Sequence, residues 1–289
     1  VRWQGPGSTT SVSASKEGSR RHLIHGYAAT GESGTLTRYM DAMGRLPMLL
    51  HPAPKDALVI CFGTGQTVRG VLDENPGSLT VVDVNPAVFR LDPRVHTQVM
   101  DGRAWLRRTA ERYDVVTLEP MPPFFAGSNA LYSVEFYDLI RSRLREGGLV
   151  AQWFPLHLMT PPHARAIAAA FVKVFPRCML WFDPANRDRF GNLQQGVLIG
   201  CAGGGGAFDW PGFQRPADVR PLTQQEAASF VLLNSAQLAA YAGNADPVTD
   251  DNQILSFGTE GLHKQNLTGK AVTATNFNDL WQFQRPAAQ

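Results

Sequence analysis

The sequence Leu58-Val59-Ile60-Cys61-Phe62-Gly63-Thr64-Gly65-Gln66-Thr67 decides the fold class of this chain. An apolar run leads directly into a pair of glycines, and a second apolar run ends at Asp83, 18 residues after Gly65. Glycines allow a buried strand to turn sharply into a helix, and an acid at the end of the next strand can accept hydrogen bonds from ribose hydroxyls. The pattern predicts a parallel α/β sheet with a nucleoside site at the carboxyl ends of its strands.

Strands and helices alternate on both sides of this stretch. The predicted strands are Ala57–Phe62, Leu79–Val84, Val95–Met100, Asp114–Leu118, Leu149–Phe154, Met179–Phe182 and Gln195–Gly200. The predicted helices are Thr37–Leu50, Thr67–Asp73, Gly102–Ala110, Ser133–Arg145 and Pro161–Val174, with one or two more between Thr223 and Ala242. Such alternation predicts a Rossmann-like parallel sheet with helices on both faces.

The organisation of the chain suggests three parts. Residues 1–52 contain a predicted β-hairpin and an approach helix, residues 53–202 form the Rossmann-like domain, and residues 203–289 form a C-terminal extension that packs on the core. Only residues 85–94 connect the second and third strands, whereas a crossover with a helix needs about 10–12 residues. Either this crossover is a bare loop or residues are absent between Arg90 and Asp92, and the two prolines favour the second reading. Gly203–Gly206 suggests a similar gap or a linker.

Composition narrows the possible partners. The chain has 289 residues, 44% hydrophobic and 18% charged, and a net charge of +2 gives no argument for nucleic acid or a membrane surface as partner. The three cysteines, Cys61, Cys178 and Cys201, favour buried free thiols and therefore a reducing, cytoplasmic compartment. No apolar run approaches the ~20 residues of a membrane span. Because the sequence begins at Val1 rather than at a methionine, it is compatible with being a piece of a longer protein.

The glycine loop favours an adenosyl ligand. Gly63, Thr64, Gly65 and Gln66 are expected to line it, and Val68 occupies the position where dinucleotide-binding loops carry a third glycine beside the pyrophosphate. A ligand without phosphates therefore suits the loop better than NAD. The alternative is a tight strand–helix turn that binds nothing.

Two acids follow neighbouring strands. Asp83 is expected to accept hydrogen bonds from ribose hydroxyls, and its alternative role is to cap the segment that follows. Asp101 is expected to accept from an adenine amine, while Gly102 keeps the floor of the site open. Asp101 is equally suited to be the N-cap of the next helix, and both roles can hold together.

A third acid, Glu119, follows the strand Asp114–Leu118 and precedes prolines. There it can attract a sulfonium charge and accept a proton from an attacking amine, or it can bond to the following loop instead. Gln152 and Trp153 can line a substrate pocket. His157 can titrate near neutrality, although a packed surface histidine is the alternative. Thr249-Asp250-Asp251 indicates a turn rather than a metal site, so no metal is expected.

Taken together, these residues resemble the spermidine synthase (polyamine aminopropyltransferase) family from about His22 to Phe257. The similar segments are Tyr39–Met43, Leu46–Pro52, Gly63-x-Gly65, Asp83, Asp101-Gly102, Gly127-Ser128, Leu131–Ser133 and Glu135–Tyr137. Gln152–Leu156 and Thr249–Asp251 are similar to a bacterial subgroup that is often fused to membrane segments. The resemblance implies a methyltransferase-type fold and decarboxylated S-adenosylmethionine, or S-adenosylmethionine, as donor.

The resemblance also assigns roles to residues. Tyr39 and Glu119 are implied as catalytic, and Asp41 and Tyr132 as substrate-binding, with a small amine as the acceptor. The resemblance is compatible with a homodimer. It is also compatible with this chain being the soluble domain of a membrane protein that has upstream membrane segments.

Departures from the family pattern leave the reaction open. Thr64 stands where the synthases usually carry an aspartate for the donor's amine, Met40 replaces a histidine, and prolines replace the second aspartate after Glu119. The alternatives to aminopropyl transfer are an S-adenosylmethionine-dependent methyltransferase or related adenosyl enzyme with a non-polyamine acceptor, and a non-catalytic adenosyl-binding domain of a larger membrane protein.

Overall fold

The computed structural model describes residues 38–89, 93–183, 195–203, 231–256, 279–280 and 282–283, together with four short strands between residues 2 and 28. These strands are β1 (Arg2–Gly5), β2 (Ser8–Ala14), β3 (Arg20–Ile24) and β4 (Tyr27–Ala28), and they form an antiparallel sheet in that order. The predicted N-terminal hairpin is therefore confirmed as β2 and β3.

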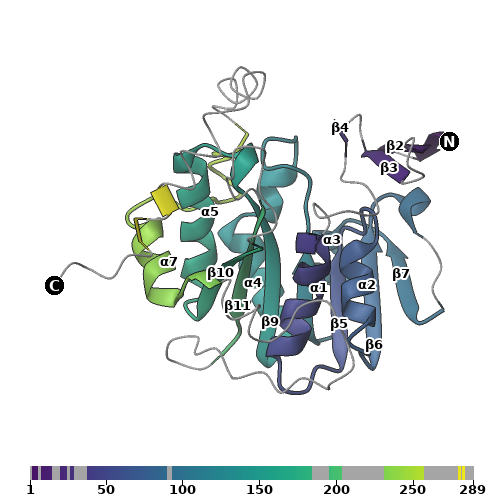
Figure 1. Cartoon of the computed structure of the whole chain (residues 1–289), viewed down its shortest axis with the longest axis horizontal. Coiled ribbons are helices and arrows are strands. Elements are labelled where there is room, and N and C mark those ends of the chain that lie inside the picture. The colour runs from purple at the N-terminus through teal and green to yellow at the C-terminus, as the bar shows by residue number, and fades with distance from the viewer. Residues whose placement is uncertain are drawn as a thin grey trace.

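A second sheet of eight strands forms the centre of the molecule (Figure 1), in the order β12-β10-β11-β9-β8-β5-β6-β7. Its strands are β5 (Asp56–Ile60), β6 (Ser78–Asp83), β7 (Val95–Val99), β8 (Tyr113–Leu118), β9 (Leu144–Pro155), β10 (Cys178–Phe182), β11 (Gln195–Cys201) and β12 (Val231–Leu233). The five strands from β7 to β9 are parallel, and β11, β10 and β12 continue the sheet antiparallel. The α/β fold class with a mostly parallel sheet is confirmed.

Helices cover both faces of this sheet. They are α1 (Arg38–Leu50), α2 (Gln66–Leu72), α3 (Gly102–Arg108), α4 (Val134–Arg143), α5 (Pro161–Val174) and α7 (Ser235–Ala242), with 3-10 turns η2 (Pro86–Val88), η3 (Ser128–Leu131) and η4 (Leu156–Leu158). The helices α1 and α2 pack side by side on one face, and α3, α4, α5 and α7 cover the other (Figure 1).

The alternation of side chains along each strand explains the two layers. In β5, Ala57 and Val59 pack in the cluster beneath α2, whereas Leu58 and Ile60 pack in the large cluster with α4 and α5. Both faces of the strand are buried, so its sequence is a continuous apolar run rather than an alternating one. This is the reason that the stretch at 58–62 indicated the fold so clearly.

Three expectations are corrected. The helix predicted to end at Arg145 ends at Arg143, because Gly147 and Gly148 belong to β9, where the pairing with β8 shifts register. The late strands pair antiparallel rather than parallel: β11 runs antiparallel to β9, and β10 runs antiparallel to β11. Val231–Leu233, expected to be helical, is a strand. Residues 90–92 and 204–206, where absent residues were suspected, lie outside the described part of the chain.

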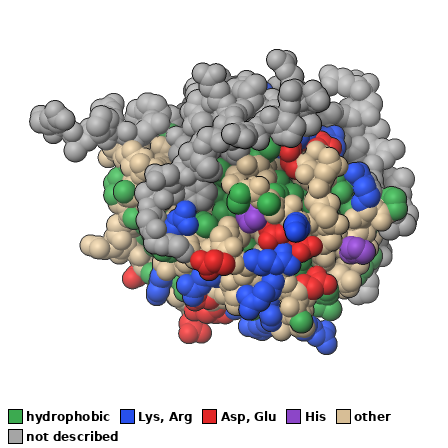
Figure 2. All heavy atoms as spheres, turned by 90° about the horizontal axis from the view of Figure 1, so that it is seen from below, with side chains coloured by type: hydrophobic (Ala, Val, Ile, Leu, Met, Phe, Trp, Pro, Cys, Tyr) green, Lys and Arg blue, Asp and Glu red, His purple; other side chains and the backbone are tan. Residues whose placement is uncertain are grey.

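The amino ends of the parallel strands carry charges of both signs. Arg145 pairs with Asp56 at 2.6 Å and with Asp114 at 3.0 Å, which ties the starts of β5, β8 and β9 together. Seen from below (Figure 2), blue and red side chains lie intermixed on this face rather than in a patch of one sign. No helix among the described residues is long and apolar enough to cross a membrane.

Candidate functional site

The predicted site residues gather where β5, β6 and β8 end. The glycine loop Cys61–Gly65 follows β5, Asp83 is the last residue of β6, and Glu119 comes directly after β8. These strands are neighbours in the sheet, and their parallel direction brings their carboxyl ends to one edge. This is the edge at which open α/β sheets bind ligands.

The glycine loop has the left-handed backbone that its sequence suggested. Gly63 has φ 55° and Gly65 has φ 81°, and the Gly65 N–H closes the turn on the Phe62 carbonyl at 2.9 Å. A Cβ on Gly65 would lie 2.8 Å from the Phe62 ring, whereas one on Gly63 would meet nothing within 4 Å. Gly65 is therefore favoured by its left-handed backbone more than by the contact with Phe62, and Gly63 borders open space that a ligand can use.

Asp83 performs the capping role that was its alternative. One carboxylate oxygen accepts from the Phe62 N–H at 2.7 Å and the other from the Asn85 N–H at 2.8 Å. Each carboxylate oxygen can accept a second hydrogen bond. The two hydrogen bonds thus fix the acid beside the glycine loop.

Asp101 is the N-cap of α3, since its carboxylate accepts from the Ala104 N–H at 2.9 Å, and its side chain is exposed. Gly102 has a packing role: a Cβ there would lie 2.2 Å from Cγ2 of Ile60. A side chain at position 102 would therefore push α3 away from β5, and with it the carboxylate of Asp101.

Glu119 and Tyr39 form the central pair of the site. The Tyr39 hydroxyl donates to Glu119 Oε1 at 2.6 Å, although the two residues are 80 positions apart. Burial raises the pKa of Glu119 to about 7, and the hydrogen bond from Tyr39 opposes this shift. A carboxylate that exchanges its proton near neutrality suits acid–base chemistry.

Aromatic rings form one wall beside this pair. The Tyr39 ring stacks on Trp153 with centroids 6.5 Å apart, and His157 meets the Trp153 ring edge-on at 6.4 Å. Trp153 is held in turn by Gln195, because its Nε1–H donates to the Gln195 Oε1 at 2.6 Å. His157 thus contacts the same tryptophan ring that stacks on Tyr39.

Two buried polar groups lie next to Glu119. Gln152 is opposite Leu118 in the β8–β9 pairing, and its Nε2 donates to the Leu131 carbonyl at 3.2 Å. The Gln152 Oε1 and the Tyr132 hydroxyl are buried and have no hydrogen-bond partner within the described residues. Burial, with smaller contributions from Tyr137, Cys61 and Glu119, holds the pKa of Tyr132 well above its usual value, and the nearby Gln152 side chain opposes this shift.

Asp41 does not join this group. Its carboxylate pairs with Arg45 at 2.8 Å, and Arg45 also binds Glu74 at 2.7 Å and Asp73 between α1 and α2. Burial raises the pKa of Asp41. Its position is explained by helix packing, because the Asp41 carbonyl faces Gly70 of α2.

Thr64 and Gln66 lie on the α1 side of the loop. The Thr64 hydroxyl contacts the Met40 sulfur at 3.7 Å, and Gln66 is buried as the first residue of α2. Thr64 and Met40, which replace an aspartate and a histidine of the family pattern, thus touch each other.

Cys61 is the site residue that sequence reasoning missed. It has φ 70°, a conformation that a side chain rarely adopts. Burial and the nearby Asp83, Glu119 and Asp101 raise the pKa of its thiol well above the usual value, which disfavours the reactive thiolate. Its position directly before the glycines was the available signal. Within the described ranges no group of three or more His, Cys, Asp or Glu side chains is placed to hold a metal.

The chain is similar in sequence to curated polyamine aminopropyltransferases. Polyamine aminopropyltransferase 2 of Pseudomonas aeruginosa is 33% identical over 171 residues, which are 53% of this chain and 48% of that protein. The polyamine aminopropyltransferase of Bacillus subtilis is 29% identical over 158 residues, 48% of this chain and 56% of that protein. The chain spans about half the length of the curated relatives it matches.

Solved structures share the fold. The spermidine synthase of Thermotoga maritima superposes with a TM-score of 0.60 at 17% identity, covering 93% of this chain and 87% of that one. A spermidine synthase in complex with the transition-state analogue AdoDATO gives the same TM-score and identity, over 93% and 86% of the two chains. Residues 36–182 match the family model described as the spermine/spermidine synthase domain, and this chain therefore belongs to the spermine/spermidine synthase family.

Proposed function

We propose that this chain is an aminopropyltransferase that moves the aminopropyl group of decarboxylated S-adenosylmethionine to a small amine. The observation that carries the proposal is the Tyr39–Glu119 pair: a carboxylate with a pKa of about 7 stands at the strand ends, next to a glycine loop suited to an adenosyl group. The relatives named above are polyamine aminopropyltransferases, which supports the same assignment.

The donor would occupy the edge formed by β5 and β6. Gly63 leaves open space for it, Asp83 is held beside the glycine loop where it would accept from ribose hydroxyls, and Asp101 with Gly102 would border the adenine. The sulfonium would then face Glu119, whose carboxylate is favourable to a nearby positive charge. No metal is required for this arrangement.

The acceptor amine would bind between Glu119 and Gln152. The unpaired Gln152 Oε1 is a buried acceptor that an amine N–H can satisfy, and the rings of Tyr39 and Trp153 would contact its methylene groups. The amine nitrogen forms a bond to the carbon beside the sulfonium while the carbon–sulfur bond breaks. The electron pair of that bond stays on sulfur, methylthioadenosine leaves, and the proton of the amine passes to Glu119.

Replacement of the acid tests this proposal. Glu119→Gln keeps the shape but cannot accept the proton, so we expect kcat with decarboxylated S-adenosylmethionine and 1,4-diaminobutane to fall by about 10²–10⁴-fold. The affinity for methylthioadenosine, measured by calorimetry, should change little. Glu146→Gln, at an exposed position of β9, is the matched control and should keep full activity. Unchanged turnover in Glu119→Gln would remove the proposed role.

The Thr64–Met40 contact favours a second candidate. Both side chains are uncharged, so they offer no carboxylate to the donor's amine, and a donor that retains its own carboxylate is then less disfavoured. This would be S-adenosylmethionine-dependent methyl transfer. Calorimetric titration with S-adenosylmethionine, its decarboxylated form and methylthioadenosine separates the candidates: tight binding of the carboxylated donor alone would exclude aminopropyl transfer, and binding of none would leave no adenosyl site.

A further inference from the structure

A segment near the end of the described chain lies over the loop that leads into α4. This segment, residues 247–255, is called here the C-terminal strap. The Val134 N–H donates to the Val248 carbonyl at 2.9 Å. Asn129 is fully buried and bonds the strap twice, donating to the Thr249 carbonyl at 3.1 Å and accepting from the Leu255 N–H at 3.1 Å.

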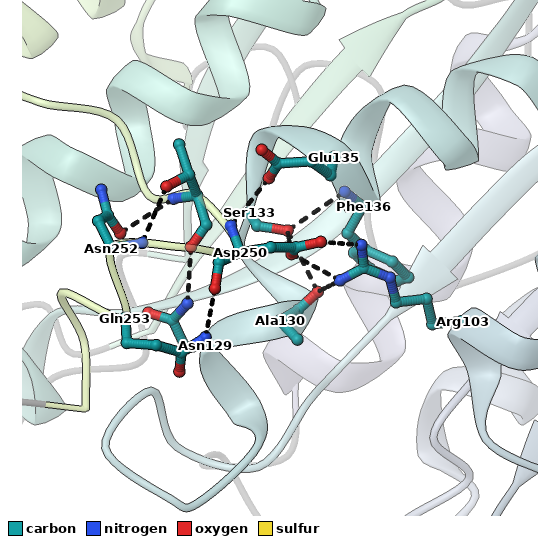
Figure 3. A network of polar contacts seen from close by, with 10 residues as sticks. Arg103, Asn129, Ala130, Ser133, Glu135, Phe136, Asp250, Asn252 and Gln253 are labelled. Carbon is teal, nitrogen blue, oxygen red and sulfur yellow. Dashed lines mark hydrogen bonds and ion pairs between the residues drawn. The ribbon is translucent and has the colours of Figure 1, made fainter.

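Asp250 lies at the centre of these contacts (Figure 3). Its two carboxylate oxygens accept from the two Nη groups of Arg103, with Nη1 at 2.7 Å from Oδ1, and the Ser133 hydroxyl donates to Oδ1 at 2.7 Å. Its backbone N–H donates to Glu135 Oε2 at 3.0 Å. The paired guanidinium and carboxylate form a fork that fixes orientation as well as distance.

Arg103 links Asp250 both to helix α3 and to the loop that leads to Tyr132. It lies in the first turn of α3, directly after Gly102, and its Nη1 also donates to the Ala130 carbonyl at 3.1 Å. The next residue, Leu131, accepts from the Gln152 side chain through its carbonyl, and Tyr132 follows it. One arginine thus joins the start of α3 to the segment that carries Tyr132.

The loop between Glu119 and Tyr132 is built from turns rather than from a strand ladder. It contains prolines and the short turn η3 but no strand, and its backbone makes turn bonds such as Phe125 N–H to the Pro122 carbonyl at 2.9 Å. A loop of this kind is held by tertiary contacts rather than by a ladder. Arg103, Asn129 and the strap supply such contacts at its carboxyl end.

We propose that Asp250 is a positioning residue of this site: through Arg103 and Ser133 it holds the loop that ends at Tyr132 against the start of α3. Its kinetic consequences rest on the proposed function, whereas its effect on the loop does not. Binding of the donor should depend little on Asp250, because Gly102 of α3 also packs directly against Ile60.

The test compares Asp250→Asn with Asp251→Asn. Asp251 is the exposed neighbour and serves as the matched control. Amide hydrogen exchange, measured by mass spectrometry on the intact chain, should become at least about tenfold faster in residues 124–132 of Asp250→Asn and stay unchanged in the control. Exchange in the strands β5 and β8 should not change.

Kinetics with decarboxylated S-adenosylmethionine and 1,4-diaminobutane provide the second measurement. A misplaced loop should lower kcat by about ten- to a hundredfold while the affinity for methylthioadenosine stays within about twofold. If Asp250 only stabilised the fold, its replacement would lower the melting temperature without lowering kcat selectively over the affinity for methylthioadenosine. Arg103→Lys keeps the charge and removes the fork, so it should reproduce the exchange and kcat effects if Asp250→Asn does not fold.

Each outcome decides something. Unchanged exchange in residues 124–132 of a folded Asp250→Asn overturns the positioning role whatever the activity. Faster exchange with unchanged kcat overturns the link to catalysis. If the wild-type chain turns over no amine yet the loop exchanges faster in the variant, the proposed function fails and the holding contact stands.

Discussion

At the scale of single residues, the state of Glu119 is set by two opposing influences. Burial raises its pKa to about 7, and the hydrogen bond from Tyr39 lowers it. Tyr39→Phe removes the lowering contribution, so the pKa of Glu119 should rise further and a smaller fraction should be ionised at pH 7. The acid limb of kcat/KM should move to higher pH, and the rate at pH 7 should fall several-fold.

A pH–rate profile from pH 5 to 9 measures this shift for Tyr39→Phe against the wild type. Tyr241→Phe, in the α7 layer on the opposite face of the sheet, is the matched control and should leave the limb in place. A limb that stays in place or moves to lower pH in Tyr39→Phe would mean that its hydroxyl does not stabilise the carboxylate of Glu119.

Single residues also show where sequence reasoning stops. The positions of Asp83 and Glu119 could be predicted, because a residue that ends a parallel strand must lie at the ligand edge. The bonds of Arg45 to Asp73 and Glu74 could not, because they form only once α1 packs on α2. The positive φ of Cys61 is also invisible in the sequence, since a cysteine in an apolar run indicates a buried strand residue.

At the scale of elements, the contact between α1 and α2 sets the depth of Tyr39. A Cβ on Gly44 would lie 2.3 Å from the Thr67 carbonyl, so the two helices approach through backbone contact. Gly44→Ala should gain a few tenths to about 1 kcal/mol of helix propensity and lose more to the clash, giving a net loss of about 1–3 kcal/mol in the free energy of unfolding.

Urea unfolding followed by circular dichroism measures this difference. Arg69→Ala, at an exposed position of α2, is the control and should change the free energy of unfolding by less than about 0.5 kcal/mol. A neutral or stabilising Gly44→Ala would show that α1 can shift outward without cost, and the Tyr39–Glu119 contact should then be re-examined in that variant.

Elements differ in how well their sequence predicts them. Helix α5 begins and ends where its pattern places it, with Pro161 at the first turn. Gly147 and Gly148 led to a helix end being predicted too late in the sequence, because glycines are typical of a helix end. Here a Cβ on Gly148 would lie 2.9 Å from the Arg145 carbonyl, so the glycine permits an irregular start of β9. The sequences of β10 and β11 do not reveal whether these strands run parallel or antiparallel to their neighbours. Both strands are buried on both faces, so their residues are apolar whichever way they run.

At the scale of the whole molecule, β9 joins a parallel half to an antiparallel half. It pairs with β8 on one side and with β11 on the other. The largest core cluster crosses this junction without a break, from Ile60 through Phe154 to Leu198 and Tyr241. A core shared in this way should unfold as one unit. A destabilising substitution in the antiparallel half should therefore lower the stability of the adenosyl edge by the same free energy as that of the antiparallel strands.

Leu198→Ala tests this unity, because Leu198 is fully buried in β11, on the far side of β9 from the candidate site. The truncation should cost about 2–5 kcal/mol of unfolding free energy. Circular dichroism, tryptophan fluorescence and loss of methylthioadenosine binding should then share one lowered midpoint in urea. Val99→Ala, on the edge strand β7 at a side chain that is 57% exposed, should shift that midpoint little. Two separate transitions in Leu198→Ala, with binding retained through the first, would mean that the parallel half folds and holds its ligand without the antiparallel strands.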